Sequence, residues 1–181
     1  MNLKEITRSQ EYKYRGKIVN LRLDEAELPN GRRAAREVVE HVGGACVAAL
    51  TEKNELLFVR QFRYPYGEAL LELPAGKLEP GEEPEAGIRR ELLEETGAVG
   101  GTFHFLGKLY PTPGYCDEVL WMYATRVARR TDSQPDEDEF LEVETIPLAE
   151  AVKMVMAQKL PDAKTQAAIL IIDRLVQEGK L

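Results

Sequence analysis

The sequence predicts an α/β or α+β sandwich, and three observations support this fold class. Short apolar or alternating runs, the pattern of β-strands, dominate the middle of the chain. A helical segment between a proline and a glycine interrupts them at residues 84–96. Helical patterns also close the chain from residue 148 onward. Strands with interspersed helices stack in layers, because each element must bury its apolar side against another.

The N-terminal region predicts an antiparallel β extension. Residues 18–28 and 32–42 are extended candidates, joined by Pro29-Asn30-Gly31. Asn-Gly between two such runs is a strong hairpin signal, because both residues tolerate positive φ. We therefore assign residues 1–43 to an N-terminal β extension and residues 44–181 to the main domain.

The main domain begins with short apolar runs, partly β-branched, that predict buried strands. Residues 45–50 and 55–62 are separated by a polar turn, and Pro74 closes the run at 68–73. Later strands are expected around the Pro/Gly-rich loop 111–117 and after an acidic stretch. These later strands span residues 102–110, 118–127 and 140–146.

Three helices are expected. Pro84 suits the first turn of a helix over residues 84–96, and Gly97 is a natural left-handed stop. Two closing helices fit residues 148–158 and 162–178. The last of them shows helical apolar spacing at Ala168, Ile171, Ile172 and Leu175.

Composition and charge exclude several function classes. No apolar run approaches the roughly 20 residues that span a bilayer, and the N-terminus lacks the apolar stretch of a secretory signal. Cys46 and Cys116 are expected to be thiols in a reducing compartment. A net charge of −7 argues against general nucleic-acid binding, which needs basic surface. We expect a cytoplasmic protein with no nucleic-acid or membrane partner. The negative net charge does not exclude one small anionic ligand, because a bound divalent metal can make the local charge positive.

The segment from Gly76 to Ala98 carries the chemistry. Glu91 and Glu95 are four residues apart on the expected helix and share a face, with Glu94 beside them. Like charges at this spacing repel, and a divalent cation such as Mg²⁺ offsets the repulsion because it prefers hard oxygen ligands. Arg90, four residues before Glu94, is placed to pair with it.

Gly87, in the middle of the same helix, costs about 1 kcal/mol relative to alanine. Room for a bulky ligand and a close helix–strand contact are both accounts of this glycine. The sequence leaves them open.

The length of the pattern argues against a merely solvated acidic helix. It runs Gly, five residues, Glu, seven residues, then Arg-Glu-Leu-x-Glu-Glu-x-Gly. Eight fixed positions at average usage arise by chance with odds on the order of one in a billion per start point. The pattern matches every fixed position of the Nudix box, so the chain resembles Nudix hydrolases. The matching residues are Gly76, Glu82, Arg90, Glu91, Leu92, Glu94, Glu95 and Gly97.

The resemblance implies a Nudix-type α/β/α sandwich with a mixed sheet and hydrolysis of a nucleoside diphosphate linked to another group. It implies that Glu91 and Glu95 ligate Mg²⁺, with Mn²⁺ as the alternative ion, and that the carbonyl of Ala75 supplies another oxygen. Glu94 would act as a catalytic residue, directly or through a neighbour. Four residues would mainly hold the box together: Gly76, Glu82, Arg90 and Gly97. Ala98 departs from the bulkier aliphatic residue usual there, which concerns packing.

Flanking segments resemble the Nudix enzymes that act on ADP-ribose. Pro113 lies sixteen residues past Gly97, a spacing characteristic of that subfamily, and the blocks 36–41, 59–64 and 72–77 are also similar to it. The resemblance spans roughly residues 10–175. It implies cleavage of ADP-ribose to AMP and ribose 5-phosphate by a homodimer that pairs through its N-terminal strands.

The same resemblance implies the residues that bind substrate. Arg36 and Glu37 would help bind the adenosine end across the dimer interface, and residues 112–115, which include Thr112 and Pro113, would line the ribose side. A plain turn proline is the alternative for Pro113. From its own chemistry, Arg63 offers a planar fork of donors to a phosphate, and Arg60 is a weaker candidate for that role. A surface salt bridge is the alternative for both of these arginines.

A general base is needed near the attacking water. By resemblance it comes from the acidic loop at residues 134–139, where we select Glu137 as base and Glu139 as an extra metal ligand. A solvated acidic turn is the alternative for either residue. Two other functions stay open: hydrolysis of another nucleotide sugar or dinucleotide, such as GDP-mannose, and a sensor that binds ADP-ribose without cleaving it.

Overall fold

The computed structural model describes residues 2–134 and 140–181. The chain divides into two compact units. The first unit comprises residues 1–43 and 110–119, and the second comprises residues 44–109 and 120–181. None of the helices in the described residues is long and apolar enough to span a membrane.

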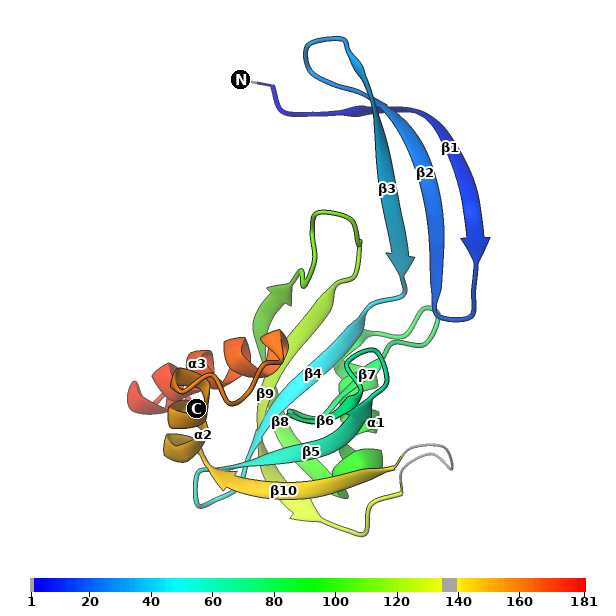
Figure 1. Ribbon diagram of the computed structural model, residues 1–181. Coiled ribbons are helices and arrows are strands. Elements are labelled where there is room, and N and C mark those ends of the chain that lie inside the picture. The colour runs from blue at the N-terminus through cyan, green and yellow to red at the C-terminus, as the bar shows by residue number, and fades with distance from the viewer. Residues whose placement is uncertain (1, 135–139) are drawn as a thin grey trace. The chain divides into compact units, whose positions relative to one another are not determined.

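The first unit is built on an antiparallel sheet with the order β1-β2-β3 (Figure 1). The predicted hairpin is confirmed, because β2 and β3 pair from Val19↔His41 at one end to Glu27↔Arg33 at the other. Its turn has Gly31 at φ 82°, a left-handed conformation that costs glycine little. The strands are β1 (Ile6–Arg15), β2 (Val19–Glu27) and β3 (Arg33–His41).

Strand β1 was not predicted. All ten of its residues are exposed, so no alternation of buried and exposed positions marks it in the sequence. Its remaining signal is local preference, since Ile6, Thr7, Tyr12 and Tyr14 are residue types that favour strands.

The loop 110–119 belongs to the first unit because it pairs with β3. The amide of Val39 donates to the carbonyl of Tyr115 at 2.8 Å, and the amide of Asp117 donates to the carbonyl of Val39 at 3.1 Å. The Asp117 carboxylate also accepts from the amide of His41 at 2.8 Å. These contacts fix the loop residues that follow Pro113.

The second unit contains a mixed sheet with the order β10-β5-β4-β9-β8, in which β4 and β9 run parallel. Strand β6 extends β5, and the short β7, which was not predicted, pairs with β4. The strands are β4 (Gly44–Leu50), β5 (Glu55–Arg63), β6 (Glu68–Glu72), β7 (Ala75–Lys77), β8 (Ala98–Leu109), β9 (Leu120–Arg130) and β10 (Leu141–Pro147).

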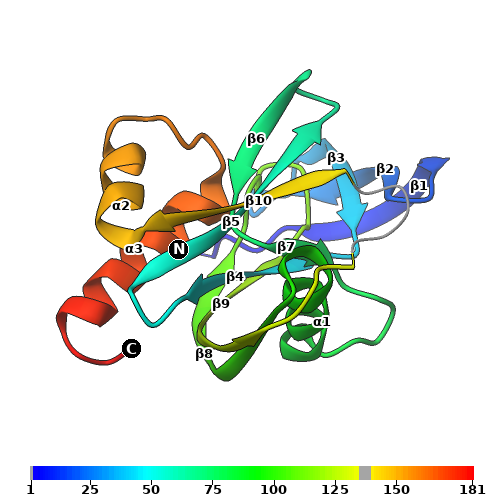
Figure 2. The same cartoon turned by 90° about the horizontal axis from the view of Figure 1, so that it is seen from below.

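Helices cover both faces of this sheet, as Figure 2 shows for the second unit. Strand β4 is buried along its whole length, because alternate side chains face the two helical layers. Val47 packs in a cluster with Ile88 of α1, whereas Leu50 packs in another with Ile169 of α3. The predicted α/β/α sandwich is thereby confirmed. The helices are α1 (Pro84–Thr96), α2 (Leu148–Met156) and α3 (Ala163–Gln177).

Candidate active site

Helix α1 begins and ends where the sequence predicts. Pro84 occupies its first turn, and Gly97 ends it at φ 66° while donating to the carbonyl of Leu93 at 2.8 Å. A Cβ at position 97 would lie 2.1 Å from the carbonyl oxygen of Thr131. Gly97 is therefore required both for the left-handed turn and for the close approach of the chain at Thr131.

Glu91 and Glu95 both reach the backbone of β7. The Glu95 side chain accepts a hydrogen bond from the amide of Ala75 at 3.1 Å, and Glu95 is only 3% exposed. A Cβ at Gly76 would lie 1.9 Å from the carboxyl carbon of Glu91. Gly76 is therefore the gap into which the Glu91 carboxylate fits. Two carboxylates one helical turn apart meet two consecutive residues of one strand.

Arg90 holds the carboxylates of this region together. Its guanidinium donates to Glu91 and Glu94 at 2.9 Å each and to Glu82 at 3.2 Å. The pairing with Glu94 that the spacing predicts is present. The hydrogen bond with Glu82 is the main cause that raises the pKa of Arg90, against the opposing effect of burial. Repulsion among the carboxylates is thus partly offset without a metal.

The loop before α1 is tied to the helix through Glu82. Its carboxylate accepts from the amide of Glu79 at 2.9 Å, and the hydrogen bond from Arg90, followed by this one, lowers the pKa of Glu82. A Cβ at Gly87 would lie 2.8 Å from Leu78 and 2.9 Å from Glu82. The close-contact account of Gly87 therefore fits better than room for a ligand, although the contact is with a loop rather than a strand.

The oxygens at this position suit a divalent ion that is also held by its substrate. Among the described residues, no group of three or more His, Cys, Asp or Glu side chains is arranged to hold a metal. Two carboxylates against the Ala75–Gly76 backbone nevertheless fit Mg²⁺, which proteins commonly hold with one or two carboxylates plus substrate phosphates. Because Gly76 has no side chain, the Glu91 carboxylate can lie against this backbone.

Arg63 and Arg60 both form ion pairs. Arg63 binds Glu72 through two hydrogen bonds, with Nε and Nη2 at 2.7 and 2.9 Å from the carboxylate oxygens. Arg60 Nε lies 2.7 Å from Glu144, and both side chains are more than a third exposed, as in a surface salt bridge. Glu72 itself is 2% exposed. The role of either arginine in phosphate binding stays a prediction.

Arg63 and Lys164 stabilise the charged form of the buried Glu72 carboxylate. Burial raises the pKa of Glu72, but the hydrogen bonds and charges of Arg63 and Lys164 oppose it and lower the pKa from 4.5 to about 2. Glu72 and Lys164 were missed as functional candidates in the sequence. Glu72 did carry a signal, because it is an acidic residue within the otherwise apolar run 69–76.

Glu137 and Glu139, the proposed base and extra ligand, lie outside the described residues. The described residues on either side are anchored. The amide of Gln134 donates to the carbonyl of Glu94 at 2.9 Å, and Leu141 pairs with Gln61 of β5. The chain therefore enters the acidic run beside the end of α1 and leaves it on the edge of the sheet.

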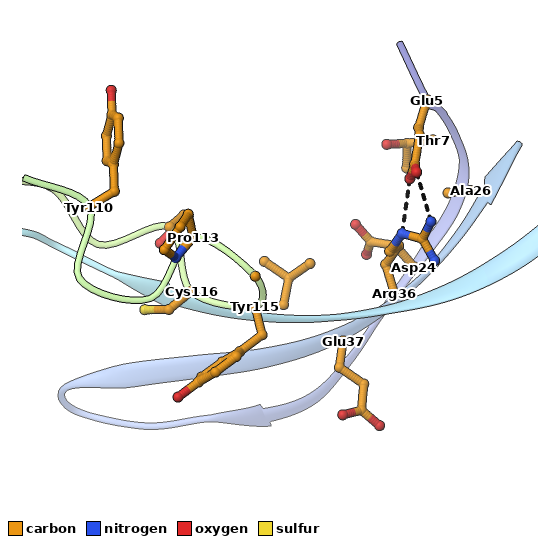
Figure 3. Close-up of a pocket in the computed structure, with 13 residues that line it drawn as sticks. Glu5, Thr7, Asp24, Ala26, Arg36, Glu37, Tyr110, Pro113, Tyr115 and Cys116 are labelled. Carbon is orange, nitrogen blue, oxygen red and sulfur yellow. Dashed lines mark hydrogen bonds and ion pairs between the residues drawn. The ribbon is translucent and has the colours of Figure 1, made fainter. Parts of the chain in front are cut away.

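A pocket of about 450 Å³ lies within the first unit, and Figure 3 shows its lining. Arg36, Glu37 and Pro113 all line it, and their roles in substrate binding stay predictions. Thr112 is not part of the described lining, but its carbonyl accepts from the amide of Cys116 at 3.1 Å. Arg36 is paired with Glu5 through Nε and Nη2, at 2.9 and 2.7 Å.

The described lining of this pocket is mostly acidic in its charged residues. It contains four carboxylates, at Glu5, Asp24, Glu37 and Asp117, and a single guanidinium, at Arg36. This balance favours hydroxyl and amino donors over phosphate groups. Asp24 was missed in the sequence as a pocket residue because it lies inside a strand pattern, where Arg22, two residues before it on the same face, donates to its carboxylate at 3.0 Å.

Two family models match the chain. The NUDIX domain matches residues 24–170. The nucleoside diphosphate sugar hydrolase N-terminal domain matches residues 5–39, which include the unpredicted β1.

Individual proteins match over most of the chain. An ADP-ribose pyrophosphatase of Bacillus subtilis (strain 168) is 39% identical over 93% of this chain and 92% of its own. A methanol dehydrogenase activator of Bacillus methanolicus is 36% identical over 91% and 90%. A crystal structure of an ADP compounds hydrolase covers all of both chains with a TM-score of 0.85 at 21% identity, which supports the fold.

Proposed function

This chain belongs to the NUDIX domain family, and we propose that it hydrolyses the pyrophosphate of ADP-ribose to AMP and ribose 5-phosphate with Mg²⁺. The observation that carries the proposal is the convergence of Glu91 and Glu95 on the backbone of Ala75 and Gly76. The high similarity to an ADP-ribose pyrophosphatase supports the choice of substrate.

The residues proposed to hold the metal are Glu91, Glu95 and the carbonyl of Ala75. When bound, a divalent cation supplies positive charge to a diphosphate and lowers the pKa of water. Mn²⁺ prefers the same oxygen ligands and is the alternative ion. Arg90 keeps the Glu91 carboxylate in place from the side of the helix, and Gly76 leaves the space that this carboxylate fills.

Glu94 and Glu137 are the proposed catalytic residues. Glu94 is 36% exposed and forms an ion pair with Arg90. It assists the hydrolysis directly or through a neighbouring residue. Glu137 takes the proton of the attacking water, and Glu139 adds a metal ligand. The hydrogen bond from Gln134 to the Glu94 carbonyl supports this assignment, because the acidic run begins beside the metal-binding helix.

The first unit is proposed to bind the nucleoside. Arg36 and Glu37 would hold the adenosine end, and Thr112 and Pro113 the ribose side. The acidic lining supports binding of hydroxyl and amino groups. We also propose a homodimer that pairs through the N-terminal strands; the wholly exposed β1 supports this, because it leaves a long strand surface for a second copy. The cytoplasm is the proposed location.

A second substrate class is favoured by a specific observation. The N-terminal residues match the nucleoside diphosphate sugar hydrolase domain, a description that includes other sugars. GDP-mannose is the representative compound. The methanol dehydrogenase activator, at 36% identity against 39% for the pyrophosphatase, carries a different name, so similarity at this level does not by itself decide the activity.

A substrate panel tests the proposal. ADP-ribose, GDP-mannose, a flavin dinucleotide and a nicotinamide dinucleotide are each incubated with the enzyme and Mg²⁺, and the products are identified by mass spectrometry. We expect ADP-ribose to give the highest kcat/KM, with AMP and ribose 5-phosphate as products. A higher value for GDP-mannose would support the second class. Binding of ADP-ribose without any cleavage would contradict the enzyme and support a sensor.

A further inference from the structure

A cluster of four charged side chains lies in the second unit at the junction of β5, β6 and α3. Arg63 and Lys164 supply the cations, and Glu72 and Asp162 supply the carboxylates. Glu72 is 2% exposed and Lys164 is 7% exposed. Charges this deep persist only when they are paired, because burial otherwise favours the neutral forms. The pairing is complete, since two positive groups meet two negative ones.

Glu72 fixes the plane of the Arg63 guanidinium. Its two oxygens accept from Nε and Nη2, so one edge of the planar fork is occupied and its orientation is set. The Nη1 group lies outside this pair of hydrogen bonds. The Arg63 side chain is 36% exposed, and the charge of Glu95 contributes to raising the pKa of Arg63. Glu72 thus holds one edge of the guanidinium, while the Arg63 side chain remains partly exposed.

Lys164 holds Glu72 from the other side. It forms a close ion pair with Glu72 and lies 3.0 Å from Asp162. Asp162 begins α3, because its carboxylate accepts from the amide of Thr165 at 3.0 Å. The Thr165 hydroxyl in turn accepts from the amide of Leu73 at 2.9 Å. The first turn of α3 therefore binds the end of β6 through Lys164 and Thr165. This point of the chain lies just before the Ala75–Gly76 backbone.

We propose that Lys164 is a positioning residue for diphosphate binding: by holding Glu72, it sets the orientation in which Arg63 meets the substrate. This inference rests on the proposed hydrolysis of a nucleoside diphosphate and on phosphate binding by Arg63. Lys164 does not itself touch the substrate, because its side chain is 9% exposed and engaged by two carboxylates. Without Lys164, Arg63 alone would balance the buried charge of Glu72 and would be drawn away from a phosphate.

The test is a double-mutant cycle between Lys164→Met and Arg63→Ala, with ADP-ribose as substrate. We expect Lys164→Met to raise KM by about tenfold with little change in kcat, the order of one loosened charged hydrogen bond made in ground and transition states alike. In the Arg63→Ala background, Lys164→Met should leave KM unchanged, because its effect passes through Arg63. Lys153→Met, in an exposed ion pair on α2, is the matched control.

A second readout separates this inference from the proposed hydrolysis. The Kd of a non-hydrolysable α,β-methylene analogue of ADP-ribose, measured by calorimetry with Mg²⁺, should rise in parallel with KM. Glu72→Gln, which preserves side-chain volume, provides a second variant for the same test. It should raise KM when Arg63 is present and leave KM unchanged in the Arg63→Ala background. A folded Lys164→Met enzyme with unchanged KM and Kd, or an equal KM effect with and without Arg63, would overturn the inference. Failure of the wild type to cleave ADP-ribose would instead refute the proposed hydrolysis.

Discussion

The two units of this protein hold their functional charges in different ways. In the second unit, Arg90 contacts three carboxylates at once, and Gly76 and Gly97 each leave space that a single Cβ would fill. In the first unit, the predicted ligand Arg36 is paired with Glu5 at an exposed position. Exposed pairs contribute little to stability.

We expect this difference to separate the residues that act in catalysis from those that recognise the substrate. The region proposed for catalysis depends on close packing, so a change of one methyl group should disable it. The pocket proposed for recognition instead includes the Arg36–Glu5 pair, in which both side chains are more than a third exposed. Substitutions around Glu91 and Glu95 should therefore lower kcat, whereas substitutions in the pocket of the first unit should change KM and substrate preference.

The largest effect is expected from Gly76→Ala. The added Cβ would lie 1.9 Å from the carboxyl carbon of Glu91, so this carboxylate must move. We expect kcat to fall by roughly a thousandfold, because loss of a metal ligand removes several kcal/mol of charge stabilisation. Gly101→Ala, on β8, is the matched control, since its Cβ would meet only the carbonyl oxygen of Arg126 at 3.5 Å, an ordinary van der Waals contact. Equal activity of the two variants would show that the close packing at Gly76 is not needed.

Glu137→Gln comes next. Loss of the proposed base should lower kcat by about 10² or more with ADP-ribose and leave the thermal unfolding midpoint unchanged. Glu142→Gln, an exposed position on β10, is the control and should behave as wild type. Near-normal turnover of Glu137→Gln would move the role of base to another residue.

A smaller effect is expected from Glu37→Gln in the pocket of the first unit. Removing one charged acceptor should raise KM for ADP-ribose by about tenfold and leave kcat unchanged, because the contact is made equally in ground and transition states. Glu25→Gln, which is exposed on the same sheet and paired with Arg33, is the control. A fall in kcat instead would contradict the claim that the pocket of the first unit acts in substrate recognition alone.

Acid should weaken the second unit through Glu72. The folded pKa of about 2 lies below the ordinary 4.5, so this carboxylate adds stability above about pH 4.5 that is lost as the pH falls toward 2. The full contribution is on the order of 3 kcal/mol. Urea unfolding of wild type and Glu72→Gln between pH 6 and pH 3 should show the difference in unfolding free energy shrinking. A constant difference would show that the charge of Glu72 is not stabilising.

The sequence predicted the second unit better than the first. Helix α1 has the predicted bounds of residues 84–96, because Pro84 and Gly97 mark its ends and Leu92 faces a core. Strand β1 has no such mark, since none of its residues is buried. Hydrophobic periodicity indicates which side of an element is buried. It therefore cannot predict an element that has no buried residues.

Contacts across the fold explain the remaining difference. The box residues lie within one stretch of sequence, so their spacing predicts the pairing of Arg90 with Glu94. Lys164 and Glu72 are 92 residues apart, and nothing in the local sequence indicates that they meet. The short β7 was likewise missed, because three residues carry too little pattern to predict a strand.

The central claim is that Glu91 and Glu95 share one divalent ion that grips a diphosphate. Electron paramagnetic resonance of bound Mn²⁺, titrated in wild type, Glu91→Gln and Glu95→Gln with the methylene analogue present, tests it most directly. Glu85→Gln, in an exposed pair on the same helix, is the control. We predict that each of the two variants weakens Mn²⁺ binding by at least about tenfold, as expected for a lost charged ligand, while the control does not. Wild-type Mn²⁺ affinity in both variants would contradict the account.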